Sequence, residues 1–188
     1  MNVYDFDGTI FVPDSSYCFV LYCMRHYPRA VFKVLPGTLW QFILYLREGR
    51  KDAGKLKESL FSFLSRVDNI DRIVQEFWTE NFERMEAWYL EQKRSDDLII
   101  SASPEFLLAP ICEELGVRLI GTPMDPYTGK IHGLNCHDEE KVRRFYRAFP
   151  EGHIERFYSD SRSDEPLAKI ADQAFLVGKD VIQPWPDL

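Results

Sequence analysis

Two aspartates lie close together near the start of the chain, in the segment Asp5-Phe6-Asp7-Gly8-Thr9. Side chains two residues apart on an extended chain point to the same side, so the two carboxylates are expected to be neighbours. Neighbouring carboxylates repel each other unless a cation neutralises one or a proton resides on the other, and both arrangements serve catalysis. The simpler alternative is a solvated turn in which neither aspartate has a chemical role.

Two further polar residues lie where an anion could bind. Ser101 follows the apolar run Leu98-Ile99-Ile100, so its hydroxyl and the neighbouring amides should lie at the carboxyl end of a strand. Lys141 lies early in an expected helix, from which its ammonium can reach the same edge. Each residue alone has an ordinary explanation, because a serine before a helix is often a cap and most such lysines are solvated.

A second pair of aspartates, Asp160 and Asp164, follows another expected strand over residues 154–158. Together with the first pair, these carboxylates could hold Mg²⁺, which takes oxygen ligands and usually only one or two protein carboxylates. The alternative is that Asp160 merely ends the strand. Asp164 would then lie near a helix N-terminus, where the helix dipole favours negative charge.

These residues need a sheet to align them, and the pattern of the chain predicts one. The first six residues are expected to form a strand, and after Asp97 short apolar runs alternate with helices. Further strands are expected at 98–100, 117–120, 154–158 and, as the last one, 174–177, with helices at 104–115, 138–149 and 163–171. This alternation predicts the α/β class with a doubly wound parallel sheet.

The chain between these parts is helical. Apolar periodicity predicts helices over 15–33, 38–48, 54–66 and 70–93, with breaks at Pro36-Gly37, Gly49 to Gly54 and Asp68-Asn69. Such a stretch does not fit the strand–helix alternation, so it is expected to be an insertion after the first strand. We therefore predict an α/β catalytic core over residues 1–14 and 94–188 and a helical cap over 15–93.

The composition is that of a folded soluble protein of 188 residues, 45% hydrophobic and 28% charged, which excludes wholesale disorder and fibrous repeats. The net charge of −7 disfavours a nucleic-acid partner. The four cysteines lack metal-site spacing and no signal peptide is visible, so a cytoplasmic location is expected. The longest strongly apolar stretch without a charge has 13 residues, too few to span a bilayer.

In their order along the chain, Asp5-x-Asp7-x-Thr9, Ser101, Lys141 and Asp160-x-x-x-Asp164 resemble the four motifs of the haloacid-dehalogenase-like phosphatases. The resemblance spans the whole chain and implies a Rossmann-like core. The helical insertion between the first two motifs resembles the subfamily that contains the phosphoserine phosphatases and the phosphatidylglycerophosphatase C-like enzymes.

The resemblance implies a catalytic role for each motif. Asp5 would be the nucleophile that forms an aspartyl-phosphate, and Asp7 would protonate the leaving oxygen and later activate water. Ser101 and Lys141 would hold the phosphoryl oxygens.

The resemblance also implies a Mg²⁺ site. Its ligands would be the Asp5 carboxylate, the Asp7 backbone carbonyl and Asp160, with Asp164 binding the ion or orienting its ligands.

Two positions depart from the family pattern. Ser159 stands where the fourth motif usually has glycine. In phosphoserine phosphatases a glutamate lies nine residues after the nucleophile and helps recognise the amino acid, whereas Asp14 occupies that position here. Asp14 is therefore a candidate for substrate selectivity.

The predicted function is a Mg²⁺-dependent phosphomonoesterase acting on a small-molecule or lipid phosphate ester. The alternatives are a phosphatase for phosphoserine or another small metabolite, a phosphotransferase, and a non-catalytic module that binds metal or phosphate. A dehalogenase is disfavoured because such enzymes lack the second aspartate, here Asp7.

Residues 15–57 carry eight basic and only two acidic residues, together with many aromatic and aliphatic ones. This mixture predicts peripheral contact with an anionic membrane at its inner face, and with it a lipid-borne substrate such as phosphatidylglycerophosphate. The alternative is that the apolar residues pack the cap. Packing would bury Trp40, Phe42 and Tyr45, whereas docking would leave several exposed beside Arg47, Arg50 and Lys51.

Overall fold

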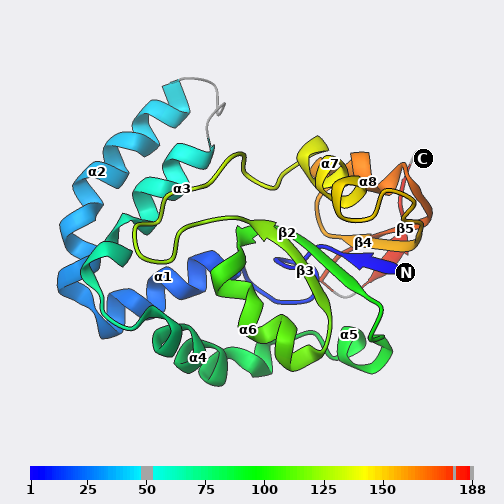
Figure 1. Cartoon of the computed structure of the whole chain (residues 1–188), viewed down its shortest axis with the longest axis horizontal. Helices are drawn as coiled ribbons and strands as arrows, with labels where there is room; N and C mark the ends of the chain where they lie inside the picture. Colours follow the sequence, from blue (N-terminus) through cyan, green and yellow to red (C-terminus); the bar gives the residue numbers. More distant parts are fainter. Residues whose placement is uncertain (48–52, 180, 187–188) are drawn as a thin grey trace.

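The fold is built on one six-stranded sheet, seen in a computed structural model that describes residues 1–47, 53–179 and 181–186. The strand order is β3-β2-β1-β4-β5-β6 (Figure 1). The first five strands are parallel, and the last pairs antiparallel with its neighbour. The strands are β1 (Asn2–Tyr4), β2 (Leu98–Pro104), β3 (Arg118–Thr122), β4 (Ile154–Ser159), β5 (Ala171–Val177) and β6 (Ile182–Pro184). Because the order reverses at β1, a crevice is expected at the carboxyl ends of β1 and β4.

Alternate residues of the strands point to opposite faces, and each face has its own apolar cluster. The face with Tyr4 and Tyr158 packs against α5 (Ala87–Gln92) and α6 (Glu105–Leu115). The face with Phe157 packs against α7 (Glu139–Ala148) and α8 (Glu165–Ala168). Covering both faces permits a parallel sheet of buried apolar strands. The predicted α/β fold is confirmed.

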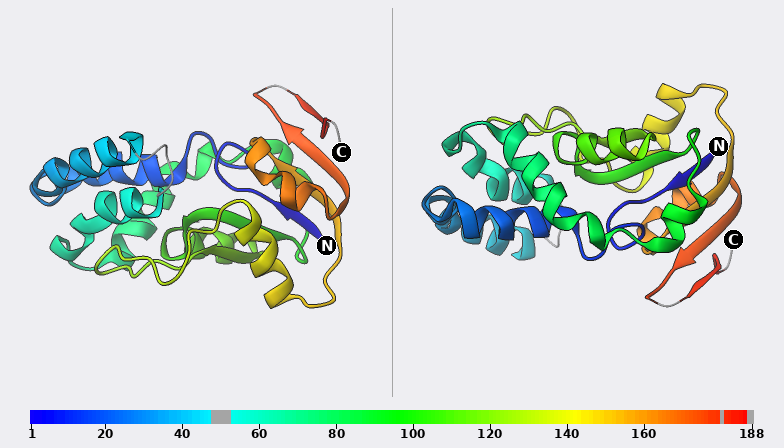
Figure 2. Two further views of the ribbon diagram at one scale, coloured as in Figure 1. Left: turned by 90° about the horizontal axis from the view of Figure 1, so that it is seen from above. Right: turned by 90° about the horizontal axis from the view of Figure 1, so that it is seen from below.

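The helices between β1 and β2 extend away from the sheet. Figures 1 and 2 show α1, α2 and α3 as a lobe beside the carboxyl end of the sheet. None of the helices within the described ranges is long and apolar enough to span a bilayer. The elements of this segment are α1 (Ser15–His26), α2 (Pro28–Arg47), α3 (Ala53–Phe61), a 3-10 helix (Ser62–Arg66), α4 (Ile70–Asn81), a second 3-10 helix (Phe82–Arg84) and α5.

The predicted helix break at Pro36-Gly37 is wrong, because α2 runs through both residues. The chain breaks earlier, and Pro28 begins α2, where a proline fits because the first helical residue needs no N–H partner. Pro36 lies on the exposed side of the helix. There water can serve the carbonyl that the proline ring leaves without a donor. Most of the predicted break from Gly49 to Gly54 lies outside the described residues.

The predicted single helix over 70–93 is also wrong. At Met85 the backbone pairs with Phe11 in the loop after β1. The amide of Glu86 donates to the Ile10 carbonyl at 2.9 Å. This pairing replaces helical hydrogen bonds and separates α4 from α5.

Two differences lie near the C-terminus. The chain continues past the predicted last strand into β6, a short strand of exposed residues that carries no alternating pattern. The helix predicted over 163–171 is shorter, because Ala171 already begins β5.

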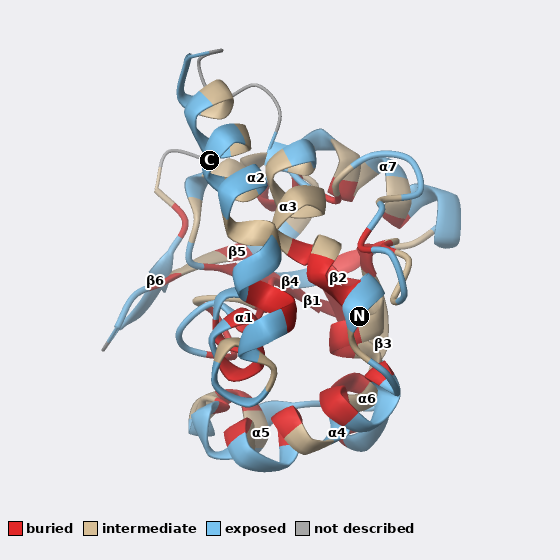
Figure 3. Cartoon of the chain, turned by 90° about the vertical axis from the view of Figure 1, so that its left-hand side faces the viewer, coloured by how far each residue is buried: buried red, intermediate tan, exposed pale blue. Residues whose placement is uncertain are grey.

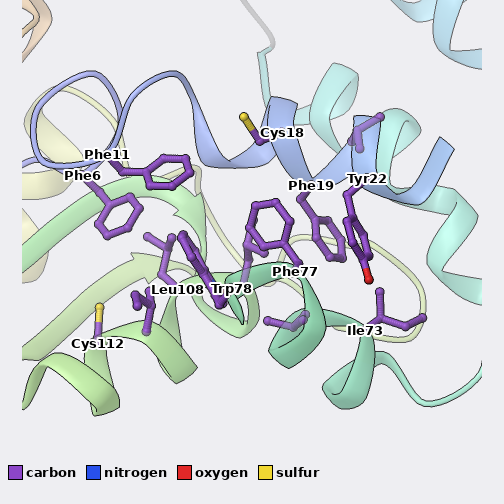
Figure 4. Packing of buried hydrophobic residues seen from close by; sticks show 14 of the residues in the cluster. Phe6, Phe11, Cys18, Phe19, Tyr22, Ile73, Phe77, Trp78, Leu108 and Cys112 are labelled. Atoms are coloured by element: carbon purple, nitrogen blue, oxygen red, sulfur yellow. The ribbon is translucent and has the colours of Figure 1, made fainter. Parts of the chain in front are cut away.

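Helix α4 joins the helical lobe to the sheet (Figure 4). The Trp78 ring packs edge-on against Phe6 and Phe11, with ring centroids 5.8 and 5.2 Å away. Its indole N–H donates to the Leu107 carbonyl at 2.6 Å. Toward the lobe, Phe77 packs against Phe19 at 5.4 Å. One apolar cluster therefore continues from the sheet into the lobe. The division into a core (1–14 and 94–188) and a cap (15–93) remains a proposal.

A hairpin after β3 makes a second connection. Met124 pairs with Ile131, and the Ile131 amide donates to the Glu58 carboxylate of α3 at 2.8 Å. Gly129, at φ +73°, lies directly against the backbone of Phe61, the last residue of α3. The core hairpin therefore supports the end of α3.

We predict that Gly129→Ala destabilises the fold more than Gly116→Ala does. Both glycines have φ near +70°, so alanine costs each about 1 kcal/mol of backbone strain. A Cβ at Gly129 would lie 2.5 Å from the Phe61 carbonyl oxygen, whereas nothing lies within 4 Å of one at Gly116. In Gly129→Ala this overpacking should lower the free energy of unfolding by about a further 1–3 kcal/mol, which urea unfolding would measure. Equal losses of unfolding free energy in the two variants would contradict the close contact between Gly129 and Phe61.

Candidate active site

The carboxyl ends of β1, β2 and β4 bring most of the predicted site residues to one edge of the sheet. Parallel strands end at the same edge, so loops that are far apart in the chain meet there. Asp5 and Asp7 follow β1, Ser101 lies in β2, Asp160 and Asp164 follow β4, and Lys141 reaches the edge from the first turn of α7.

Lys141 forms the central ion pair of this edge. Its Nζ donates to Asp5 Oδ1 and to Asp164 Oδ2, both at 2.7 Å. All three residues are buried. Ser159 adds a hydroxyl donor to Asp164 Oδ2 at 2.8 Å. The residue that replaces the usual glycine of the fourth motif therefore helps to hold Asp164.

Burial has a large effect on the pKa values of Asp5 and Lys141. It raises the pKa of Asp5 to about 7, an effect that Lys141 opposes and Asp164 reinforces. Burial acts against the charged form of Lys141, but Asp5 and Asp164 hold the pKa of that ammonium above its ordinary value. Two carboxyl groups thus share one cation, so the site has one more carboxyl group than this lysine can neutralise.

Asp7 is held by serines that face it from two elements. The Ser103 hydroxyl donates to Asp7 Oδ2 at 2.6 Å, and the Ser15 amide donates to Asp7 Oδ1 at 2.6 Å. The Ser101 hydroxyl lies 3.5 Å from Asp7 Oδ2 and accepts from the Ser103 amide at 3.0 Å. Burial and the charge of Asp14 raise the pKa of Asp7, and the hydrogen bonds from Ser103 and Ser15 oppose the shift.

Ser103 is a site residue that the sequence argument missed. It lies two residues after Ser101 on β2, and it is buried. The spacing of two was the available signal, because two serines at this spacing on a strand face the same side.

Asp160 is held against the loop that follows β1. Its amide donates to the Thr9 hydroxyl at 2.9 Å, so the threonine of the first motif positions the aspartate of the fourth. Gly8 has φ +72°, and a Cβ there would lie 2.2 Å from Asp160 Oδ2. Only glycine leaves room for this carboxylate beside Asp7.

The donors at this edge suit a hard cation. Asp5 and Asp160 offer carboxylate oxygens, and Asp164 Oδ1 is buried without a hydrogen-bond partner in the described protein. In the described part of the chain, no three acidic, histidine or cysteine side chains are arranged to hold a metal ion together. Lys141 already lies between Asp5 and Asp164, but Mg²⁺ requires only one or two carboxylates. Its charge would balance the surplus negative charge, so the residues fit the ion.

Asp14 and Lys57 bring charges from the helical segment toward this edge. Asp14 is exposed and caps α1, accepting from the Tyr17 amide at 2.6 Å. Lys57 of α3 is half-buried and donates to the carbonyl of Ala102 at 2.7 Å. Burial lowers the pKa of Lys57, while Asp7 and Asp14 oppose that shift. Sequence reasoning missed Lys57 as a site residue, because no motif signals a contact made across the fold.

A cleft of about 1120 Å³ lies between the lobe and the core, and its lining includes sequence neighbours of Lys141 and Asp164. Its walls come from α3 and the start of α7, and they include Glu58, Arg143 and Arg162. None of the predicted catalytic residues lines it.

Comparisons by sequence identify relatives. A family model described as haloacid dehalogenase-like hydrolase matches residues 3–169. Protein CicA from Caulobacter vibrioides strain NA1000 / CB15N is 30% identical over 186 residues, covering 90% of this chain and 82% of that protein. A histidinol-phosphatase from Neisseria meningitidis serogroup C strain 8013 is 31% identical over 98 residues, covering 45% of this chain and 44% of that protein.

Solved structures share the fold. A protein of unknown function from Bordetella pertussis Tohama I matches with a TM-score of 0.77 at 21% identity, covering 93% of this chain and 87% of that one. A phospho-aspartyl intermediate analogue of phosphoserine phosphatase matches with a TM-score of 0.54 at 14% identity, covering 92% and 83%. From the span of the family match and the identity to CicA, the chain belongs to the haloacid dehalogenase-like hydrolase family.

Proposed function

We propose that this hydrolase is a Mg²⁺-dependent phosphomonoesterase that works through an aspartyl-phosphate on Asp5. The observation that carries the proposal is the buried Asp5 carboxylate, held by Lys141 at the carboxyl edge of the sheet beside Asp7. The family match, the phosphoserine phosphatase fold neighbour and the histidinol-phosphatase relative support a phosphatase.

The proposed reaction has two steps. Asp5 Oδ1 accepts from Lys141, which leaves Oδ2 to attack phosphorus. The bond from phosphorus to the ester oxygen breaks, and Asp7 gives that oxygen a proton. Asp7 then takes a proton from water as the water oxygen attacks the phosphorus of the aspartyl-phosphate. The bond from phosphorus to Asp5 Oδ2 breaks, phosphate leaves, and both aspartates return to their first state.

The remaining residues compensate charge. Ser101 and Lys141 would hold the phosphoryl oxygens, whose charge otherwise repels the attacking carboxylate. Mg²⁺ would be held by Asp5, the Asp7 carbonyl and Asp160, with Asp164 as a further ligand or as an orienting group. When bound, the ion supplies positive charge to the phosphoryl group.

For the substrate we propose an ester whose leaving group carries a negative charge. Lys57 forms no ion pair with any described residue, so its ammonium can meet such a charge near Asp7. Phosphatidylglycerophosphate has this chemistry, because its leaving group contains a phosphodiester. The alternative is phosphoserine, whose carboxylate Lys57 would hold and whose ammonium Asp14 would hold. A cytoplasmic location is part of the proposal, since all four cysteines are free and buried.

Replacing Asp5 by asparagine should abolish turnover of p-nitrophenyl phosphate, because the amide keeps the shape but does not attack phosphorus. We expect a loss of roughly a thousandfold or more in kcat. The fold should be retained, at a lowered melting temperature, because Lys141 loses one charged partner and keeps Asp164. Asp172→Asn, at the opposite end of the sheet, is the matched control. Asp7→Asn should accumulate a phospho-enzyme visible by intact mass. Near-wild-type turnover by Asp5→Asn would remove the nucleophile assignment, and catalytic silence of the wild type would favour a binding module.

Removing divalent metal should stop turnover, and added Mg²⁺ should restore it, because the surplus negative charge of the site repels a phosphate ester. Asp160→Asn should raise the Mg²⁺ concentration for half-maximal rate by about tenfold or more. A rate that chelator leaves unchanged would contradict a metal-dependent mechanism.

Lys57→Met should lower kcat/KM for an ester with an anionic leaving group by about tenfold to a hundredfold. That is the effect of losing a hydrogen bond to a charged group, about 1.5–3 kcal/mol. Esters with neutral leaving groups should change little. Asp14→Asn keeps the helix cap. If this variant lowered kcat/KM for phosphoserine alone, the result would identify the amino-acid substrate instead. Equal losses on neutral and anionic esters would exclude Lys57 as the selectivity residue.

A further inference from the structure

Helix α2 leaves large apolar side chains in water. Only Ala30 and Val31 are buried along its twenty residues. Figure 3 shows most of its surface as exposed or half-buried. Trp40 is 57% exposed and Phe42 44%, so packing within the cap does not explain these residues, although Tyr45 is half-buried. Arg50 and Lys51 lie outside the described residues.

The exposed apolar residues form a stripe along the helix. Phe32, Leu39, Ile43 and Leu46 are 55%, 61%, 40% and 48% exposed. Their spacing of seven, four and three residues places them on one side of an α-helix. The opposite side faces α3, where the Thr38 hydroxyl donates to the Ser59 carbonyl at 3.2 Å. The stripe therefore points away from the rest of the lobe.

Basic residues border this stripe. At about 100° per residue, Arg29 and Arg47 lie about 60° around the helix from Phe32, and Lys33 about 100°. The helix contains no acidic residue, although the chain as a whole has a net charge of −7. An apolar stripe beside basic residues is the pattern of a helix that lies in the interface of an anionic membrane.

We propose that the outer face of α2 docks on an anionic lipid bilayer. Exposed apolar side chains would enter the headgroup region while Arg29, Lys33 and Arg47 meet lipid phosphates. A second copy of the chain fits this face less well, because a two-fold contact would bring these cations together without an acidic partner on α2. Docking rests on the proposed function and deepens it, since it would keep the enzyme at a surface that carries lipid-borne phosphate esters.

The test is cosedimentation of the full chain with phosphatidylglycerol vesicles and with phosphatidylcholine vesicles, at low and physiological salt. We expect binding to phosphatidylglycerol that weakens with salt, because such attraction is screened within about 8 Å at physiological ionic strength. Vesicles should also shift tryptophan emission to the blue through the exposed Trp40. Trp78 and Trp185 are already buried, and Trp88 is half-buried against the core cluster.

Two double variants test the two parts of the surface. Leu39→Ser with Ile43→Ser removes the centre of the stripe, and Arg29→Glu with Lys33→Glu reverses its basic border. Each should weaken vesicle binding by about tenfold or more. Leu134→Ser and Lys130→Glu are matched controls on exposed residues elsewhere, and they should bind like wild type.

Docking would be overturned if the wild type bound no vesicles at either salt concentration, or if both double variants bound vesicles like the wild type. It would also be overturned if the wild type bound no vesicles but formed dimers that Leu39→Ser with Ile43→Ser abolished. Turnover of p-nitrophenyl phosphate in solution keeps this test separate from the proposed function. The docking variants should retain it, and Asp5→Asn should lose it while still binding vesicles.

Discussion

A single buried ammonium holds the candidate site together. Lys141 pairs with Asp5 after β1 and with Asp164 after β4, so it joins the two central strands of the sheet to α7. Removing one partner of a buried pair is strongly destabilising, typically by about 3–5 kcal/mol, because it leaves a charge without compensation. The same pair keeps the proposed nucleophile in one orientation, so stability and chemistry depend on one interaction.

The site nevertheless gathers more carboxyl groups than its lysine can neutralise. Four aspartates meet at one edge, and burial raises the pKa of Asp5, Asp7 and Asp160. An arrangement optimised for stability alone would not gather carboxylates in a buried place. The surplus is understandable if the edge is completed by a cation and receives an electrophilic phosphorus.

The helical segment divides into two parts with different surroundings. Near the sheet, Phe19, Phe77 and Trp78 are buried in the shared core. The hairpin at Gly129 supports α3 from the other side, and α3 carries Lys57 to the carbonyl that follows Ser101. Far from the sheet, α2 has Trp40 and its apolar neighbours in water. In our proposals the inner part of the lobe meets the substrate and the outer part meets a membrane.

By itself the sequence determined the alternation of strands and helices, the inserted helical segment and the order of the motifs. These suffice to place Asp5, Ser101, Lys141 and Asp160 at one edge, because parallel strands carry their carboxyl ends to the same side of a sheet. The hydrogen-bond partners within that edge depend on distances that no spacing rule encodes. The close contact of Ser103 with Asp7 is therefore a result of the tertiary structure.

Only the tertiary structure decided the course of the helices and the burial of their side chains. Helix α2 continues through Pro36 because that position faces water, and the chain leaves the helix at Met85 because it pairs with Phe11. Lys57 approaches the site through a contact with Ala102, a residue far away in sequence. The aromatic residues of the helical segment look alike in the sequence, yet Phe77 is buried and Trp40 is exposed. Periodicity shows which side of a helix is apolar, but only the packing of distant elements determines whether anything covers it.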